Sequence, residues 1–108
     1  MIICVDLDGT LYKGTAWNEN DIKNSVPNPA VVRWVNQKYK KDFIVIWTAR
    51  RPQLYFPSIQ KLWQDGIFFH ALACGQGGKC PADLYLDDKS FTPQEIILEE
   101  MEDALLGG

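Results

Sequence analysis

Short, uninterrupted apolar runs recur along the chain between longer amphipathic segments. They occupy residues 2–5, 43–47, 68–73 and 84–86 and are rich in β-branched and aromatic side chains. Continuous apolar runs of this length are typical of strands that are buried on both faces of a parallel sheet. The pattern therefore predicts a parallel sheet of about four strands.

Two of the intervening segments have the periodicity and boundary residues of helices. Asn28 and Pro29 are a capping residue and a first-turn proline, and the helix that they start should extend to about residue 40. A second helix should run from Pro57 to just before Gly66, which would end it in a left-handed conformation. The side chains expected to face inward are Val32, Val35 and Tyr39 in the first helix and Ile59, Leu62 and Trp63 in the second.

A third helix is predicted after the last strand, where residues 92–95 form a capping box with a proline in its first turn. Its inward face would carry Ile97, Met101, Ala104 and Leu105. Residues 11–27 fit neither periodicity and are interpreted as a loop or small hairpin, and residues 50–56 as a loop. Strands that alternate with helices indicate an α/β fold, and 108 residues suffice for one domain, 1–108, but not for two.

The composition is that of an ordinary globular protein, with 46% hydrophobic and 23% charged residues. A net charge of −3 argues against a general electrostatic grip on nucleic acid or on an anionic membrane, although it leaves room for a local basic patch. The first apolar run is interrupted at Asp6 and is too short for a signal peptide or a membrane span. We therefore expect a cytoplasmic protein with no membrane partner. The three cysteines, Cys4, Cys74 and Cys80, lack the spacing of a metal or redox pair and are interpreted as free thiols.

Chemical groups gather where the predicted strands end, and the carboxyl ends of parallel strands share one ligand-binding edge. Asp6 and Asp8 follow the first strand and, in extended chain, would point the same way. So close a pair repels unless a proton or cation intervenes. Gly9 permits a sharp turn after them, and Thr10 adds a hydroxyl. The alternative interpretation is a polar turn after a strand.

Asp87 and Asp88 follow the last predicted strand at the same edge. Alone, they are equally well interpreted as solvated loop acids. Together with the first pair they bring four carboxylates to one rim, which favours a hard divalent cation with oxygen ligands. Mg²⁺ is the natural candidate.

Thr48 and Lys79 add groups that suit a phosphate. Thr48 follows the second strand and precedes Ala49 and Arg50, so its hydroxyl and the backbone amides of the turn can hold phosphate oxygens. Lys79, in a glycine-rich segment, would place an ammonium group on the phosphate and on the charge of the transition state. Taken singly, a strand-ending threonine and a solvated lysine are the simpler interpretations.

The ordered set Asp6-x-Asp8-Gly9-Thr10, Thr48, Lys79 and Asp87-Asp88 resembles the four motifs of the haloacid dehalogenase (HAD) superfamily, most of whose members are phosphatases. The resemblance covers residues 4–89. It implies a three-layer α/β/α Rossmann-like core with about four parallel strands. The intervals between the motifs are too short for a cap domain, so the resemblance is to the small capless phosphatases, with an open active site and residues 11–27 as a flap.

The resemblance also implies roles. Asp6 would attack phosphorus to form an aspartyl-phosphate, and Asp8 would protonate the leaving oxygen and then activate water. An aspartate at the position of Asp8 favours phosphate-ester hydrolysis over dehalogenation. The Mg²⁺ ligands would be Asp6, the backbone carbonyl of Asp8, and Asp87, with Asp88 acting through water or as an orienting group. The residues on the substrate side would be Thr48 and Lys79, which fix the phosphoryl oxygens, and Gly9, Thr10, Ala49 and Arg50.

The expected enzyme is thus a HAD-type phosphomonoesterase whose substrate is a nucleic-acid end or a sugar phosphate. Lys13, Arg50 and Arg51 motivate the former, unless the arginines pair with acids of the chain itself. The alternative is a catalytically weak phosphate-binding or regulatory module with the same fold. A homo-oligomer would require apolar surface, for which the candidates, unless they belong to the core, are Trp17, Trp34, Tyr55 and Phe56.

Overall fold

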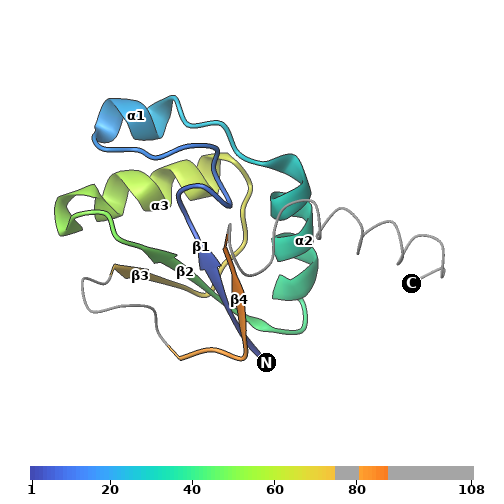
Figure 1. Cartoon of the computed structure of the whole chain (residues 1–108). Helices are drawn as coiled ribbons and strands as arrows, with labels where there is room; N and C mark the ends of the chain where they lie inside the picture. The colour runs from blue at the N-terminus through green and yellow to red at the C-terminus, as the bar shows by residue number, and fades with distance from the viewer. Residues whose placement is uncertain (75–80, 88–108) are drawn as a thin grey trace.

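The computed structural model describes residues 1–74 and 81–87 of the chain. Its centre is a parallel sheet with the strand order β3-β2-β1-β4 (Figure 1). The strands are β1 (Ile2–Asp6), β2 (Phe43–Thr48), β3 (Ala71–Cys74) and β4 (Leu84–Leu86). In the middle of the sheet, Cys4 of β1 lies opposite Val45 of β2 and Tyr85 of β4. The predicted α/β fold with about four parallel strands and no cap domain is confirmed within this part of the chain.

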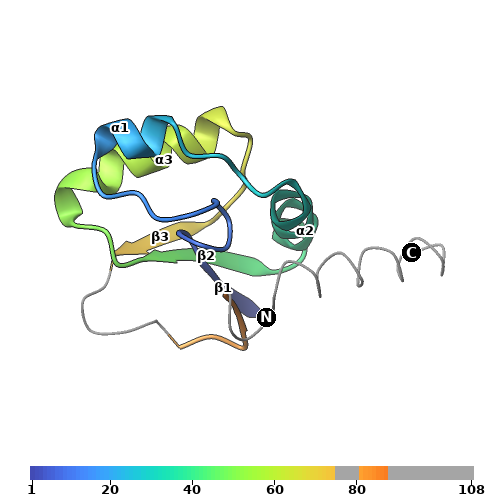
Figure 2. The same ribbon diagram turned by 45° about the horizontal axis from the view of Figure 1, so that its top comes forward.

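Two helices make the crossovers between the first three strands. Helix α2 (Pro29–Tyr39) connects β1 to β2, and α3 (Tyr55–Gln64) connects β2 to β3. Both connections advance in the same direction along the sheet, so right-handed crossovers place both helices on one face, as Figure 2 shows. The opposite helical layer of the expected three-layer arrangement is not found among residues 1–74 and 81–87. The helix predicted from residue 92 lies outside the described residues.

The hydrophobic core lies between the sheet and these two helices. Alternate residues of β1 and β2 face it, because successive side chains of a strand point to opposite sides. Side chains from the turn after β1 complete the cluster. Its members include Ile3, Val5, Leu7, Leu11, Tyr12, Val31, Trp34, Val35, Ile44, Ile46, Leu62, Ile67 and Leu86. Cys4 is a buried free thiol, whereas Cys80 and the side chain of Cys74 lie outside the described part.

The buried face of α2 differs from the predicted one. Val31, Trp34 and Val35 are buried, whereas Tyr39 is exposed and Val32 is only partly covered. The stripe i, i+3, i+4 that starts at Val31 faces the sheet in place of the predicted one, because it places the large Trp34 ring in the core. The suggestion that Trp34 supplies surface for self-association is therefore wrong. Asn28 is the N-cap residue, as predicted, but its side chain makes no capping hydrogen bond.

Helix α3 begins earlier than predicted. A short 3₁₀ turn (Pro52–Leu54) leads directly into Tyr55, so most of the segment interpreted as a loop is helical. Pro57 sits in the first turn, where a backbone N–H has no helical partner and its loss costs little. Leu62 is buried, but Trp63 is exposed, contrary to expectation. Gly66, with φ +67°, ends the helix as predicted.

Residues 11–27 contain a short helix, α1 (Glu19–Lys23), that the sequence interpretation missed. Asn18 caps it by accepting a 2.8 Å hydrogen bond from the backbone N–H of Asp21. The carboxylate of Asp21 in turn accepts a 2.9 Å bond from the N–H of Trp17. Helix α1 packs outside α3, as Figure 2 shows.

Strand β3 also begins later than predicted, at Ala71 instead of residue 68. Before it, the backbone N–H of Phe68 donates to Oδ1 of Asn36 on α2 at 2.8 Å, and the ring of Phe68 is exposed. No helix in the described ranges is long and apolar enough to cross a membrane.

Candidate active site

The carboxyl end of β1 lies at the centre of the sheet, with neighbouring strands on both sides. Asp6 is the last residue of β1 and pairs with Trp47 of β2. On the other side Val5 pairs with Leu86, so Asp87 directly follows the paired region beside Asp6. Asp87 is buried. The fold thus brings Asp6 and Asp87, distant in sequence, to the same point of the sheet edge.

After β1 the chain folds back over the strand end in a tight turn. Gly9 has a φ of +80°, which favours glycine, and its N–H is shared between the carbonyls of Tyr12 and Gly14, both at 2.9 Å. Thr10 is buried, and its hydroxyl has no hydrogen-bond partner within the described ranges. Gly9 therefore shapes the turn, and the expected contacts of Gly9 and Thr10 with substrate stay predictions.

A second turn follows β2. The hydroxyl of Thr48 accepts a 3.0 Å hydrogen bond from the backbone N–H of Arg50. Thr48 is buried, so its side chain stabilises the turn that directs Arg50. Its expected role on the phosphoryl group is a prediction.

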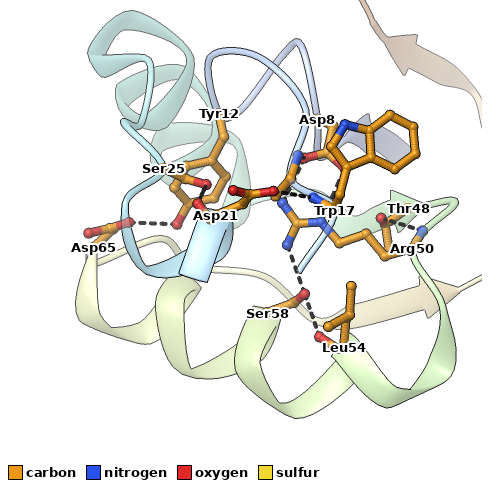
Figure 3. Close-up of polar contacts among 11 residues, drawn as sticks. Asp8, Tyr12, Trp17, Asp21, Ser25, Thr48, Arg50, Leu54, Ser58 and Asp65 are labelled. Atoms are coloured by element: carbon orange, nitrogen blue, oxygen red, sulfur yellow. Dashed lines mark hydrogen bonds and ion pairs between the residues drawn. The ribbon is translucent and has the colours of Figure 1, made fainter. Parts of the chain in front are cut away.

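The guanidinium group of Arg50 binds the carboxylate of Asp8 through two of its nitrogens (Figure 3). Nη2 lies 2.7 Å from Oδ1 of Asp8, and Nε lies 3.1 Å from Oδ2. The third nitrogen, Nη1, donates to the hydroxyl of Ser58 on α3 at 2.8 Å. Arg50 thus pairs with an acid of the chain itself, one of the alternatives that the sequence left open.

Asp8 and Arg50 border a cleft of about 520 Å³ at the sheet edge. It contains four of the predicted site residues, Asp6, Asp8, Ala49 and Arg50. The other residues around it are Thr15, Ala16, Trp17, Trp47, Arg51 and Leu54. Gly9, Thr10, Thr48 and Asp87 lie next to this cleft in sequence or register but do not line it. Lys79 and Asp88 lie outside the described residues.

Sequence reasoning missed Trp17 as a cleft residue and Ser58 as a partner of Arg50. Ser58 carries a recognisable signal, because it lies one turn before the buried Leu62 on the inward stripe of α3. A small polar residue on an apolar stripe indicates a buried hydrogen-bond partner. Trp17 offers no comparable signal, because it lies in a segment that has no helical or strand periodicity.

The oxygen donors near Asp6 suit a hard cation. Asp6 ends β1 and Asp87 follows the neighbouring strand β4, where Val5 pairs with Leu86. Asp87 is buried and Asp6 is partly buried, and two carboxylates at neighbouring strand ends favour a cation near them. Residues 1–74 and 81–87 contain no group of three or more potential side-chain ligands. Mg²⁺ fits such a set, because it is commonly bound through one or two carboxylates and retains several waters.

The fold and the cleft define an α/β protein with paired carboxylates at the carboxyl edge of a parallel sheet. Two solved structures share this fold along almost their whole length. A conserved protein from Bacteroides thetaiotaomicron is 24% identical with a TM-score of 0.67, over 96% of this chain and 91% of that one. A target protein from Vibrio cholerae is 27% identical with a TM-score of 0.62, over 94% of each chain.

The fold also matches part of a larger protein. A component of the Pnkp1/Rnl/Hen1 RNA repair complex is 18% identical with a TM-score of 0.58, over 92% of this chain but only 31% of that component. No protein-family model matches the sequence, and no curated protein matches it. The comparisons therefore establish the fold.

Proposed function

We propose that this chain is a Mg²⁺-dependent phosphomonoesterase that acts through an aspartyl-phosphate on Asp6. The observation that carries the proposal is that Asp6 and Asp8, at the end of a central strand, line one cleft together. Arg51 borders the same cleft and is exposed, so it places a positive charge where an anionic substrate would enter. The order of the motifs, similar to that of the HAD superfamily, supports the same chemistry.

The reaction consists of two displacements. In the first, a carboxylate oxygen of Asp6 bonds to phosphorus while the bond from phosphorus to the ester oxygen breaks, and Asp8 gives its proton to that leaving oxygen. In the second, water attacks phosphorus, Asp8 takes a proton from the water, and the bond between phosphorus and Asp6 breaks. The products are an alcohol and inorganic phosphate, and both aspartates return to their initial states.

Asp6, the backbone carbonyl of Asp8, and Asp87 are the groups that would hold Mg²⁺, with Asp88 in support. When bound, the cation would offset the charge of the phosphoryl oxygens and of the two carboxylates. Lys79 would add a second positive charge. Phosphoryl transfer depends mainly on such positioning and charge neutralisation.

The decisive experiment compares phosphate release by the wild type and by Asp6→Asn, with p-nitrophenyl phosphate and Mg²⁺. An amide cannot replace the attacking carboxylate, so we expect a loss on the order of 10³-fold or more. Asp42→Asn is a matched control, because Asp42 lies at the opposite edge of the sheet, where it binds the amino group of Met1 at 2.9 Å. Equal phosphate release by the wild type and Asp6→Asn would show that Asp6 is not the nucleophile.

The same materials test the alternative of a phosphate-binding module without turnover. Calorimetry with Mg²⁺ and BeF₃⁻, a mimic of the phosphoryl group on an aspartate, measures binding independently of catalysis. Binding that depends on Asp6, without turnover of any phosphate ester, would favour the regulatory module over the enzyme.

The substrate class follows from a second comparison. One structural neighbour belongs to an RNA repair complex, and Arg51 is an exposed cation at the cleft. A phosphorylated nucleic-acid end is therefore one candidate substrate, and a sugar phosphate is the other. A contact between Arg51 and a neighbouring backbone phosphate must weaken as salt increases. Measuring kcat/KM for 3′-phosphorylated oligonucleotides and sugar phosphates at several salt concentrations distinguishes the two classes.

A further inference from the structure

The side chain of Arg50 is almost completely enclosed, with only 4% of it exposed. All three nitrogens of its guanidinium group bind groups of the protein: Nε and Nη2 bind Asp8, and Nη1 binds Ser58 (Figure 3). A buried guanidinium with this many partners is held in one orientation. It therefore offers little surface to a substrate that enters the cleft from solvent.

Both ends of this arrangement are fixed by local structure. Thr48 accepts the backbone N–H of Arg50 and so sets the turn from which the side chain extends. On α3, the hydroxyl of Ser58 donates a 2.6 Å hydrogen bond to the carbonyl of Leu54, one helical turn earlier. Because the hydroxyl hydrogen is used there, the oxygen of Ser58 accepts from Arg50.

The two oxygens of Asp8 are not equivalent in this arrangement. Oδ1 accepts the shorter bond from Arg50 and a second bond from the backbone N–H of Ala16 at 3.3 Å. Among the described residues, Oδ2 accepts a single bond, of 3.1 Å. Oδ1 is thus the anchored oxygen, and Oδ2 is the oxygen with the greater remaining hydrogen-bonding capacity.

We propose that Arg50 is a positioning residue that orients the carboxyl group of Asp8 toward the leaving oxygen, and that Ser58 orients Arg50. This inference rests on the proposed function and refines it, because it assigns Arg50 to Asp8 and not to the phosphoryl group. It gives α3, which contributes no other polar group to this arrangement within the described ranges, a role in the chemistry through Ser58.

The dependence of the rate on the leaving group distinguishes this role from substrate binding. A poor leaving group such as the alkoxide of glycerol phosphate needs the proton of Asp8, whereas 2,4-dinitrophenolate departs without it. We expect Arg50→Lys to lower kcat/KM by about 10²-fold for glycerol phosphate and by less than about threefold for 2,4-dinitrophenyl phosphate. Lysine keeps the charge but cannot bind both oxygens of a carboxylate and Ser58 at once.

Two further variants complete the design. Ser58→Ala removes only the group behind Arg50, so we expect the same selectivity with a smaller loss, about tenfold for glycerol phosphate. Arg33→Gln, on the exposed side of α2, removes a positive charge away from the cleft and should match the wild type with both substrates. Inhibition by inorganic phosphate provides a readout without turnover, and Arg50→Lys should leave its inhibition constant within about twofold.

The outcomes are distinct. A selective loss with unchanged phosphate inhibition supports the positioning role. Equal losses for both substrates together with weaker phosphate inhibition would show that Arg50 binds the phosphoryl group. Unchanged rates would show that Arg50 neither binds this group nor positions Asp8. Either result overturns the positioning role of Arg50 and leaves the proposed function standing. If the wild type hydrolyses neither substrate, or Asp6→Asn retains activity, the proposed function fails with it.

Discussion

The hydroxyl of Tyr12 donates a 2.6 Å hydrogen bond to Oδ2 of Asp65. Asp65 is the C-cap residue of α3, and the same oxygen lies 3.3 Å from Nζ of Lys61. Because the ring of Tyr12 is buried, this contact joins the turn after β1 to the end of α3. The two segments that carry Asp8 and Ser58 are thereby fixed to each other at a second point.

Removal of this hydroxyl should therefore destabilise the protein. Tyr12→Phe keeps the ring and deletes the hydrogen bond, so we expect the free energy of unfolding to fall by about 1–2 kcal/mol. Tyr39→Phe, which removes a hydroxyl from an exposed ring on α2, is the matched control and should be nearly neutral. Urea unfolding measures both changes, and equal stability of the two variants would mean that the contact with Asp65 contributes nothing.

The same contact gives a prediction at alkaline pH. Burial, followed by the hydrogen bond to Asp65, raises the pKa of Tyr12 well above its usual value of about 10. A raised pKa contributes stability that is fully present below the unfolded pKa and is lost as pH rises toward the folded one. The stability advantage of the wild type over Tyr12→Phe should thus be constant below about pH 9 and shrink above about pH 10. A constant difference in unfolding free energy up to higher pH would contradict this.

His70 makes a second contact that can be tested by substitution. Its Nδ1 accepts a 2.9 Å hydrogen bond from the backbone N–H of Ile44, and the backbone N–H of His70 donates to the carbonyl of Ile44 at 2.9 Å. The imidazole also stacks on Tyr39 and Phe43, with ring centroids 4.3 Å and 4.8 Å away. The side chain thus extends the pairing of β2 beyond the start of β3.

His70→Phe keeps an aromatic ring in the stack and removes the acceptor, so it should lower the free energy of unfolding by about 1 kcal/mol. His70→Ala removes the stacking as well and should cost about 0.5–1.5 kcal/mol more. Thermal unfolding of the two variants separates the contributions. If His70→Phe were as stable as the wild type, the hydrogen bond to Ile44 would have no net value.

The sequence was sufficient to predict the features that depend on continuous patterns. The apolar run before Asp6 predicted β1 and placed Asp6 and Asp8 at its end, where the structure finds them in one cleft. It was insufficient for α1, which has only five residues and a single buried side chain, Ile22, too few to show a helical period. The sequence does contain the capping residue Asn18 and acids in the first turn. Such residues show where a helix would begin, but they do not show that a helix forms.

The pairing inside the site was beyond prediction for a different reason. Asp8 and Arg50 are 42 positions apart in the sequence, and their contact depends on the turn that Thr48 sets after β2. The sequence contains this arginine and several acids, but it offers no criterion for deciding which acid Arg50 binds. Likewise, Trp17 and Trp34 were equivalent as candidates for surface aromatics, and only the helical stripe that packs on the sheet decides that Trp34 is core.

Trp17 offers a prediction about the leaving group under the proposed function. Trp17 is 80% exposed and borders the cleft that contains Asp6, so an aromatic leaving group would contact it. We expect Trp17→Ala to raise KM about fivefold or more for naphthyl phosphate and to leave glycerol phosphate nearly unchanged. Trp63→Ala is the matched control, since Trp63 is 69% exposed on α3 and does not line the cleft. Equal effects on the two substrates would exclude a stacking role for Trp17.

Mg²⁺ binding can be tested separately from catalysis through the thermal stability of the protein. A ligand that binds only the folded state raises Tm as its concentration increases. Mg²⁺ should therefore raise Tm of the wild type, and Asp87→Asn should abolish most of this increase, because it removes one of the carboxylates expected to hold the cation. Asp83→Asn is the control: Asp83 accepts a 2.7 Å bond from the N–H of Ile2 at the opposite edge, so its loss lowers Tm without Mg²⁺ but preserves the increase. An increase retained in Asp87→Asn would place any cation elsewhere.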